Sequence, residues 1–154
     1  RADAMRTSRG TGFGLLDTDL VVTVLRARMA AAAGLDAATF EPINVLNYQV
    51  GQQYEPHYDF LNPDEPALAR TLALQGQRVA TVLTYLNGDY EGGETRFPKL
   101  DWSFKANAGD ALLFFNVDEA GRPVAKSLHA GLPPARGEKW LLSQWIRDKP
   151  QPII

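Results

Sequence analysis

The sequence contains no cysteine, which excludes disulfide bonds, thiolate metal sites and a cysteine nucleophile. It also lacks any apolar run that approaches the roughly 20 residues of a membrane-spanning helix. Clusters of one charge are missing too: 16 basic and 18 acidic residues are spread along the chain, for a net charge of -2. This distribution gives no indication of nucleic acid or a membrane as a partner, and the sequence gives none of an oligomeric state.

No secretory signal pattern stands at the start, where the sequence opens on Arg1 rather than on methionine. We expect a trimmed N-terminus. The absence of cysteine and of a signal peptide favours a reducing, cytoplasmic location. A length of 154 residues and a hydrophobic content of 45% suit a single domain, residues 1–154, with one core.

One helix is predicted near the start, over residues 19–33. Asp19 and the two residues before it can cap its N-terminus, and Gly34 supplies a C-terminal stop. The helix is expected to pack on a sheet through one broad apolar face. That face consists of Leu20, Val21, Val24, Leu25 and Ala32.

After Pro42 the sequence has β-sheet character, with short β-branched and aromatic runs between glycine- and proline-containing turns. Residues 1–16 are expected to form a loop or edge segment, 91–94 a turn, and 62–77 a loop with a helical turn from Asp64. Because no helices alternate with the later strands, we expect a mainly β sandwich or barrel and not a doubly wound fold. The predicted strands are 43–50, 54–60, 79–86, 95–97, 103–105, 111–117, 127–130 and 140–147.

The two histidines of the chain are its most informative residues. His57 lies two positions before Asp59, so both side chains can project from one face of a strand toward a metal ion. His129, far downstream, is the one remaining imidazole. Two imidazoles and one carboxylate are the ligand set of non-haem Fe(II) oxygenases, although Zn(II) accepts the same donors. Taken singly, each of these residues is more often a surface or hydrogen-bonding residue, so the joint pattern carries the hypothesis.

Lys139 stands at the start of the apolar run 140–147 and could point inward. A buried ammonium group needs an anionic partner, and a bound dicarboxylate would supply one. The alternative is an exposed lysine at a strand end beside Glu138, because lysine is rarely buried without a partner.

With these residues in place, the sequence resembles the catalytic domain of the prolyl 4-hydroxylases, within the Fe(II)/2-oxoglutarate-dependent dioxygenases. The resemblance runs from about Arg6 to Arg147. The matching stretches occur in the family's order, at residues 47–59, 78–87, 91–98, 109–115, 127–131 and 137–146.

The resemblance implies a double-stranded β-helix, or jelly roll, with one or more N-terminal helices packed on the sheet. It implies that His57, Asp59 and His129 bind iron. It also implies that Lys139 grips the distal carboxylate of 2-oxoglutarate.

Further positions match the family's pocket. Tyr48, Thr95 and Tyr85 correspond to cosubstrate-binding positions, and Arg78 and Trp145 to positions tied to peptide binding or to the site wall. For the two tyrosines and the tryptophan, ordinary aromatic core packing is the alternative.

The implied activity is hydroxylation of a prolyl residue in a peptide or protein by O2, with decarboxylation of 2-oxoglutarate to succinate and ascorbate as a candidate reductant. Because Asp59 supplies a carboxylate ligand, we expect hydroxylation and not halogenation. The chain lacks the cysteines of animal secreted members and has no room for a peptide-binding or chaperone-binding domain, which puts collagen as a substrate in doubt. The alternatives are a hydroxylase of a free amino acid or small metabolite, a non-catalytic jelly-roll metal-binding module, and a Zn(II) hydrolase.

Overall fold

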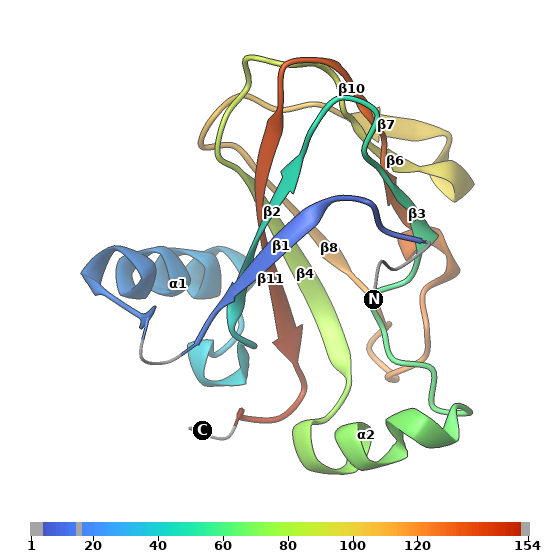
Figure 1. Ribbon diagram of the computed structural model, residues 1–154. Helices are drawn as coiled ribbons and strands as arrows, with labels where there is room; N and C mark the ends of the chain where they lie inside the picture. Colours follow the sequence, from blue (N-terminus) through green and yellow to red (C-terminus); the bar gives the residue numbers. More distant parts are fainter. Residues whose placement is uncertain (1–4, 15–16, 152–154) are drawn as a thin grey trace.

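The computed structural model describes residues 5–14 and 17–151, and its strands form two antiparallel sheets and a two-stranded ribbon (Figure 1). The larger sheet has the order β1-β2-β11-β4-β8 and the smaller one β3-β9-β6-β7. The larger sheet is built from β1 (Arg9–Phe13), β2 (Ile43–Tyr48), β11 (Lys139–Arg147), β4 (Arg78–Tyr85) and β8 (Ala111–Phe115). The smaller sheet is built from β3 (Tyr54–His57), β9 (His129–Gly131), β6 (Thr95–Phe97) and β7 (Trp102–Phe104). The ribbon pairs β5 (Glu91–Gly92) with β10 (Pro134–Arg136).

Both faces of the larger sheet carry buried residues. Successive side chains of a strand point to opposite faces, so one strand can contribute to both. On β4, Ala80 and Val82 join the core cluster that packs against the first helix. Leu83 and Tyr85 join a second cluster, which also contacts Tyr54 of the smaller sheet. The second face therefore lies between the two sheets, as expected for the interior of a jelly roll.

Helix α1 (Leu20–Ala33) confirms the predicted helix and lies against one side of the larger sheet (Figure 1). Its first turn is capped by Asp19, whose Oδ1 accepts a hydrogen bond from the Val22 backbone N at 2.9 Å. It ends at Gly34, which has a φ of 66°. That left-handed conformation favours glycine.

The prediction of which α1 residues pack on the sheet is wrong for four of the five residues, and only Leu25 does so. Leu20 and Val21 are 76% and 73% exposed, and Val24 and Ala32 are exposed as well. The residues that pack on the sheet are Val22, Leu25, Met29, Ala30 and Ala33. Apolar residues occur on several sides of this helix, so the side that meets the sheet was not determined by their positions alone.

Several segments differ from the sequence-based prediction. The 62–77 segment holds a 3₁₀ turn, η3 (Pro66–Leu68), and a helix, α2 (Ala69–Gln75). The other 3₁₀ turns are η2 (Ala37–Thr39), η4 (Pro98–Leu100) and η5 (Ala125–Ser127). Of the predicted edge segment 1–16, residues 1–4 and 15–16 lie outside the described residues, and β1 forms an edge strand within the rest. In the described part of the chain, no helix has the length and hydropathy needed to cross a bilayer.

One ion-pair cluster ties the segment just before β2 to β4 and β11. The carboxylate of Glu41 accepts two hydrogen bonds from Arg78, at 2.6 and 2.9 Å, and one from Arg147. Arg147 is only 4% exposed. Removing the carboxylate would leave both guanidinium groups without this charge partner in a largely buried place.

We therefore expect Glu41→Gln to lower the free energy of unfolding by about 3 kcal/mol. Urea denaturation followed by fluorescence measures this difference. The exposed residue Glu119 offers a matched control, and Glu119→Gln should leave the unfolding free energy close to that of the wild type. Equal stabilities of the two variants would contradict the assigned role of Glu41.

Candidate metal and cosubstrate site

The two histidines face each other across the smaller sheet, where His57 on β3 is registered with His129 on β9. Their ring centroids are 4.3 Å apart. Asp59 lies between them: its Oδ1 is 3.7 Å from His57 Nε2, and its Oδ2 is 3.7 Å from His129 Nε2. One potential ligand atom from each of the three residues lies within 4.8 Å of the other two, so the group could hold a metal ion.

The strand argument for these ligands needs a correction. β3 ends at His57, and Asp59 lies in a bend just after it, whereas the sequence predicted one strand over 54–60. The pairing of β3 with β9 is also irregular between Tyr54 and His57. The three side chains converge because the chain turns after His57, and not because two ligands share the face of a regular strand.

Both imidazoles are oriented by backbone carbonyl groups. His57 Nδ1 lies 2.7 Å from the Glu55 carbonyl oxygen, and His129 Nδ1 lies 2.9 Å from that of Ser127. A carbonyl oxygen can only accept, so each Nδ1 carries a proton, and in the neutral imidazole Nε2 then keeps its lone pair. That is the tautomer in which a histidine binds a metal through Nε2.

The charge states of His57 and Asp59 fit the same purpose. Burial, and to a smaller degree the neighbouring His129, lower the pKa of His57 to about 4. Burial alone would raise the pKa of Asp59, but the two imidazoles and a hydrogen bond from Thr81 outweigh it and hold that pKa below its usual value. At neutral pH the site therefore presents an unprotonated His57 beside a carboxylate, which are the forms that bind Fe(II).

Lys139 is the first residue of β11 and is fully buried, with an exposed fraction of 0%. Its Nζ donates to the Gly93 carbonyl oxygen at 2.8 Å and lies 3.5 Å from Thr95 Oγ1. No carboxylate among the described residues forms an ion pair with it, although Glu94 lies near enough to raise its pKa somewhat. Burial has the larger effect and lowers that pKa to about 8. The inward orientation rules out the alternative of an exposed strand-end lysine.

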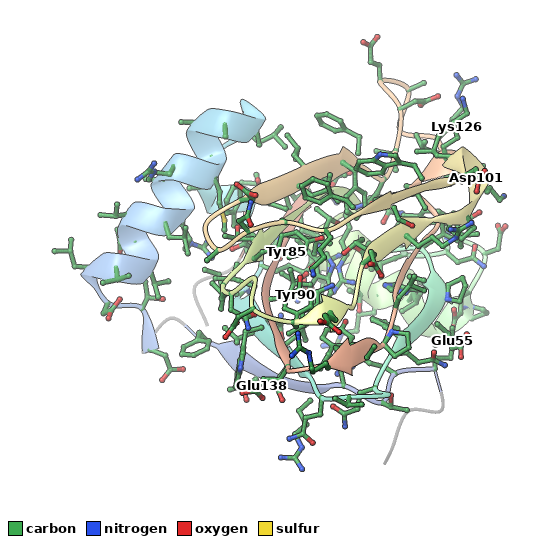
Figure 2. The ribbon with its side chains drawn as sticks, turned by 90° about the horizontal axis from the view of Figure 1, so that it is seen from above. Glu55, Tyr85, Tyr90, Asp101, Lys126 and Glu138 are labelled. Carbon is green, nitrogen blue, oxygen red and sulfur yellow. The ribbon has the colours of Figure 1, made fainter. Side chains whose placement is uncertain are left out.

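The three other residues predicted for the cosubstrate pocket surround this ammonium group. Its Nζ lies 5.3 Å from the ring centroid of Tyr48 and 5.2 Å from that of Tyr85. Tyr85 and Thr95 share a hydrogen bond of 2.6 Å between their hydroxyl oxygens. Figure 2 shows Tyr85 in the interior, whereas Glu55 lies at the periphery. Tyr48 and Thr95 line the pocket itself, and Tyr85 supports it through Thr95.

A single pocket joins the metal-binding group to the lysine. The predicted residues that line it are His57, Asp59, His129, Lys139, Tyr48, Thr95 and Trp145. Arg6 and Tyr54 are among the lining residues that were not predicted for the site. Tyr54 stacks on His57, with ring centroids 3.5 Å apart and planes 15° from parallel. Residues three apart on a regular strand point to opposite faces, so the spacing in Tyr54-Glu-Pro-His57 gave no sign of this contact.

The two residues predicted to contact a substrate occupy different positions. Trp145 lines the pocket. Arg78 is held by the Glu41 carboxylate, and its Cζ lies 3.7 Å from the ring centroid of Trp145. A contact of either residue with a substrate stays a prediction.

Comparison with known proteins identifies the class of protein to which this fold and pocket belong. The family model described as the 2OG-Fe(II) oxygenase superfamily matches residues 43–147. The chain therefore belongs to the 2-oxoglutarate–Fe(II) oxygenase superfamily, whose name states its metal and its cosubstrate. The family expected from the sequence is confirmed.

Relatives narrow the comparison to the prolyl hydroxylases. Prolyl 4-hydroxylase subunit alpha-1 of Rattus norvegicus is 38% identical over 133 residues, which cover 86% of this chain and 25% of that protein. Probable prolyl 4-hydroxylase 7 of Arabidopsis thaliana is 36% identical over an alignment of 163 positions, and the alignment covers 94% of this chain and 50% of that protein. The chain thus spans a quarter to a half of the length of these curated relatives.

A solved structure supports the fold. The viral collagen prolyl hydroxylase vCPH of Paramecium Bursaria Chlorella virus-1, in its 2OG complex, superimposes with a TM-score of 0.75 at 30% identity. The match covers 92% of this chain and 79% of the viral one. The jelly-roll architecture expected from the sequence is confirmed.

Proposed function

We propose that this domain hydroxylates a prolyl residue in a peptide or protein, using Fe(II), O2 and 2-oxoglutarate. The observation that carries the proposal is the buried ammonium group of Lys139 in the same pocket as the His57, Asp59 and His129 group. A Zn(II) hydrolase or a plain metal-binding module has no need for a buried cation at this place. A five-carbon dicarboxylate that spans the pocket explains both features.

In this proposal His57, Asp59 and His129 hold Fe(II), which, with 2-oxoglutarate and O2, supplies the chemistry that turns a C–H bond into C–OH and yields succinate and carbon dioxide. The donor set fits the metal, because two imidazole nitrogens and one carboxylate are the ligand types that non-haem Fe(II) oxygenases use. Lys139 binds the far carboxylate of 2-oxoglutarate by charge, assisted by the hydroxyl groups of Tyr48 and Thr95. The aromatic walls formed by Tyr54 and Trp145 exclude water.

The substrate assignment rests on the relatives, three of which are named as prolyl hydroxylases. Its test is anaerobic loading with Fe(II) and 2-oxoglutarate, addition of O2, and mass analysis of a proline-containing peptide. We expect a gain of one oxygen atom on proline, with one succinate formed for each hydroxylation. A gain on free amino acids but not on the peptide would overturn the prolyl-peptide assignment while leaving the oxygenase assignment in place.

The pKa of Lys139 predicts how 2-oxoglutarate binding depends on pH. In the ligand-free protein the ammonium form is complete well below pH 8 and is lost as the pH rises through about 8. Since a carboxylate binds the charged form, affinity for 2-oxoglutarate should be constant below that pH and then fall by up to about tenfold for each pH unit above it. His57, with a pKa of about 4, does not titrate in this range.

Calorimetric titration of the Mn(II)-loaded protein with 2-oxoglutarate between pH 6.5 and 9.5, as an assay range, measures this profile. Lys139→Arg is the control, because a guanidinium group stays charged throughout. The affinity of Lys139→Arg for 2-oxoglutarate should not change with pH over this range. A flat profile for the wild type would show that Lys139 does not provide the charge.

A further inference from the structure

We propose that Thr81 and Asn116 form a buried positioning relay that fixes the Asp59 carboxylate for metal binding. This inference rests on the metal site of the proposed function. Neither residue lines the pocket, and neither was indicated by the sequence. Both act through Asp59 and are positioning residues, not ligands.

The relay is a chain of two hydrogen bonds. Thr81 Oγ1 lies 2.7 Å from Asp59 Oδ2, and Asn116 Nδ2 lies 3.0 Å from Thr81 Oγ1. Thr81 and Asn116 are 0% exposed, and Asp59 is 5% exposed. All three groups are therefore shielded from water, where a hydrogen bond to a charged acceptor is strong.

The direction of the chain follows from its chemistry. The amide nitrogen of Asn116 can only donate, so Thr81 Oγ1 accepts there and directs its single proton at Asp59. With the amide turned round, its oxygen and the carboxylate would both face the one hydroxyl proton, and one of them would stay without a donor. The ordered chain therefore matches an ionised Asp59 and fixes the orientation of the Asn116 amide.

The consequence for the metal site lies in the carboxylate itself. Thr81 binds Oδ2, whereas Oδ1 receives no hydrogen bond from residues 5–14 or 17–151 and lies 3.7 Å from His57 Nε2. A carboxylate held by one oxygen loses its freedom to rotate before a metal binds. Less ordering remains to be done at the binding step, so affinity is higher.

Rigid backbone supports both ends of the relay. Thr81 lies in the middle of β4, registered with Trp145 on β11 and Phe114 on β8. Asn116 follows β8 directly, and its backbone N donates to the Val79 carbonyl oxygen at 2.8 Å. A one-residue shift between β4 and β8 would turn one partner away from the other.

A second observation concerns the other end of the Asn116 amide. Asn116 Oδ1 is buried and has no hydrogen-bond partner in the described part of the chain. An unsatisfied buried polar atom lowers stability, and an apolar side chain of similar size, such as leucine, would avoid that loss. The amide is explained by what its other end does for Thr81 and Asp59.

The test measures metal binding to the metal-free protein under anaerobic conditions, with Mn(II) as the probe and without 2-oxoglutarate. Thr81→Val removes the hydroxyl and keeps the shape, and should weaken Mn(II) binding by about 10- to 100-fold. Thr81→Ser keeps the hydroxyl, so its Mn(II) affinity should stay within about threefold of the wild type. Asn116→Leu, which does not touch Asp59, should weaken binding in the same direction by a smaller factor and serves if Thr81→Val does not fold.

Thr84→Val is the matched control, since Thr84 is a buried threonine of the same strand on the opposite face. It should bind Mn(II) like the wild type. Wild-type affinity in both Thr81→Val and Asn116→Leu would overturn the relay and leave the proposed function intact. Failure of the wild type to bind Mn(II) or Fe(II) would overturn the proposed function together with the relay.

Discussion

Replacing Lys139 by alanine is expected to raise the 2-oxoglutarate concentration for half-maximal turnover by about 30-fold or more. The reason is the loss of a buried charge partner, because truncating one side of a buried, hydrogen-bonded charge pair costs about 2–5 kcal/mol. The side chain is 0% exposed, and no carboxylate of the described residues forms an ion pair with it, so nothing nearby replaces the interaction. Initial rates of succinate formation against 2-oxoglutarate concentration measure the effect.

Two controls separate cosubstrate binding from damage to the site. The Mn(II) affinity of Lys139→Ala should stay within about threefold of the wild type. A loss of roughly tenfold or more is expected when a residue that hydrogen-bonds to a metal ligand is removed. Lys105→Ala is the matched lysine control. The Lys105 Nζ also donates to a backbone carbonyl and lies 5.0 Å from a tyrosine ring centroid. Lys105 differs from Lys139 in being exposed and outside the pocket. The dependence of Lys105→Ala on 2-oxoglutarate should be that of the wild type. An unchanged dependence in Lys139→Ala would show that the cosubstrate carboxylate binds elsewhere.

Asp59→Ala is expected to abolish turnover and to weaken Fe(II) or Mn(II) binding by more than about 100-fold. That is above the loss expected when only a residue that hydrogen-bonds to a ligand is removed. The physical reason is that the site would lose its single negative charge and one of three ligands. His57→Ala should behave in the same way. Anaerobic titration of the metal-free proteins with Mn(II) checks both variants.

Folding of these variants is monitored by circular dichroism and thermal unfolding. Asp64→Ala, at an exposed position in the loop before η3, is the matched carboxylate control and should bind Mn(II) like the wild type. Retention of full metal affinity by a folded Asp59→Ala variant would remove Asp59 from the site. Loss of affinity in Asp64→Ala as well would point to a general effect of surface charge.

The convergence of His57, Asp59 and His129 could be predicted because so few residues compete for a metal-binding role. With two histidines and no cysteine, the sequence leaves little choice of nitrogen or sulfur ligands. Lys139 was less certain from its position alone, because a lysine at a strand end is usually exposed, and the family resemblance favoured the inward orientation. The roles of these residues in the protein are still proposals, although their convergence in one pocket is observed.

Other features depend on tertiary contacts that no local pattern encodes. Thr81 reads as an ordinary β-branched strand residue, and it meets Asn116 only through the register of β4 with β8. Helix α2 has Leu68 at its N-cap, with no side-chain hydrogen bond there, so no capping residue marked its start at Ala69. The exposed Leu20 and Val21 show the same limit on α1: hydrophobicity alone did not identify the side that meets the sheet.

An anaerobic crystal structure with Mn(II) and 2-oxoglutarate tests the central claim most directly. We expect the metal on His57 Nε2, Asp59 and His129 Nε2, the keto-acid end of 2-oxoglutarate on the metal, and its other carboxylate against Lys139 Nζ. Density for 2-oxoglutarate with its distal carboxylate in solvent, or for a metal that leaves out any of the three residues, would contradict the account.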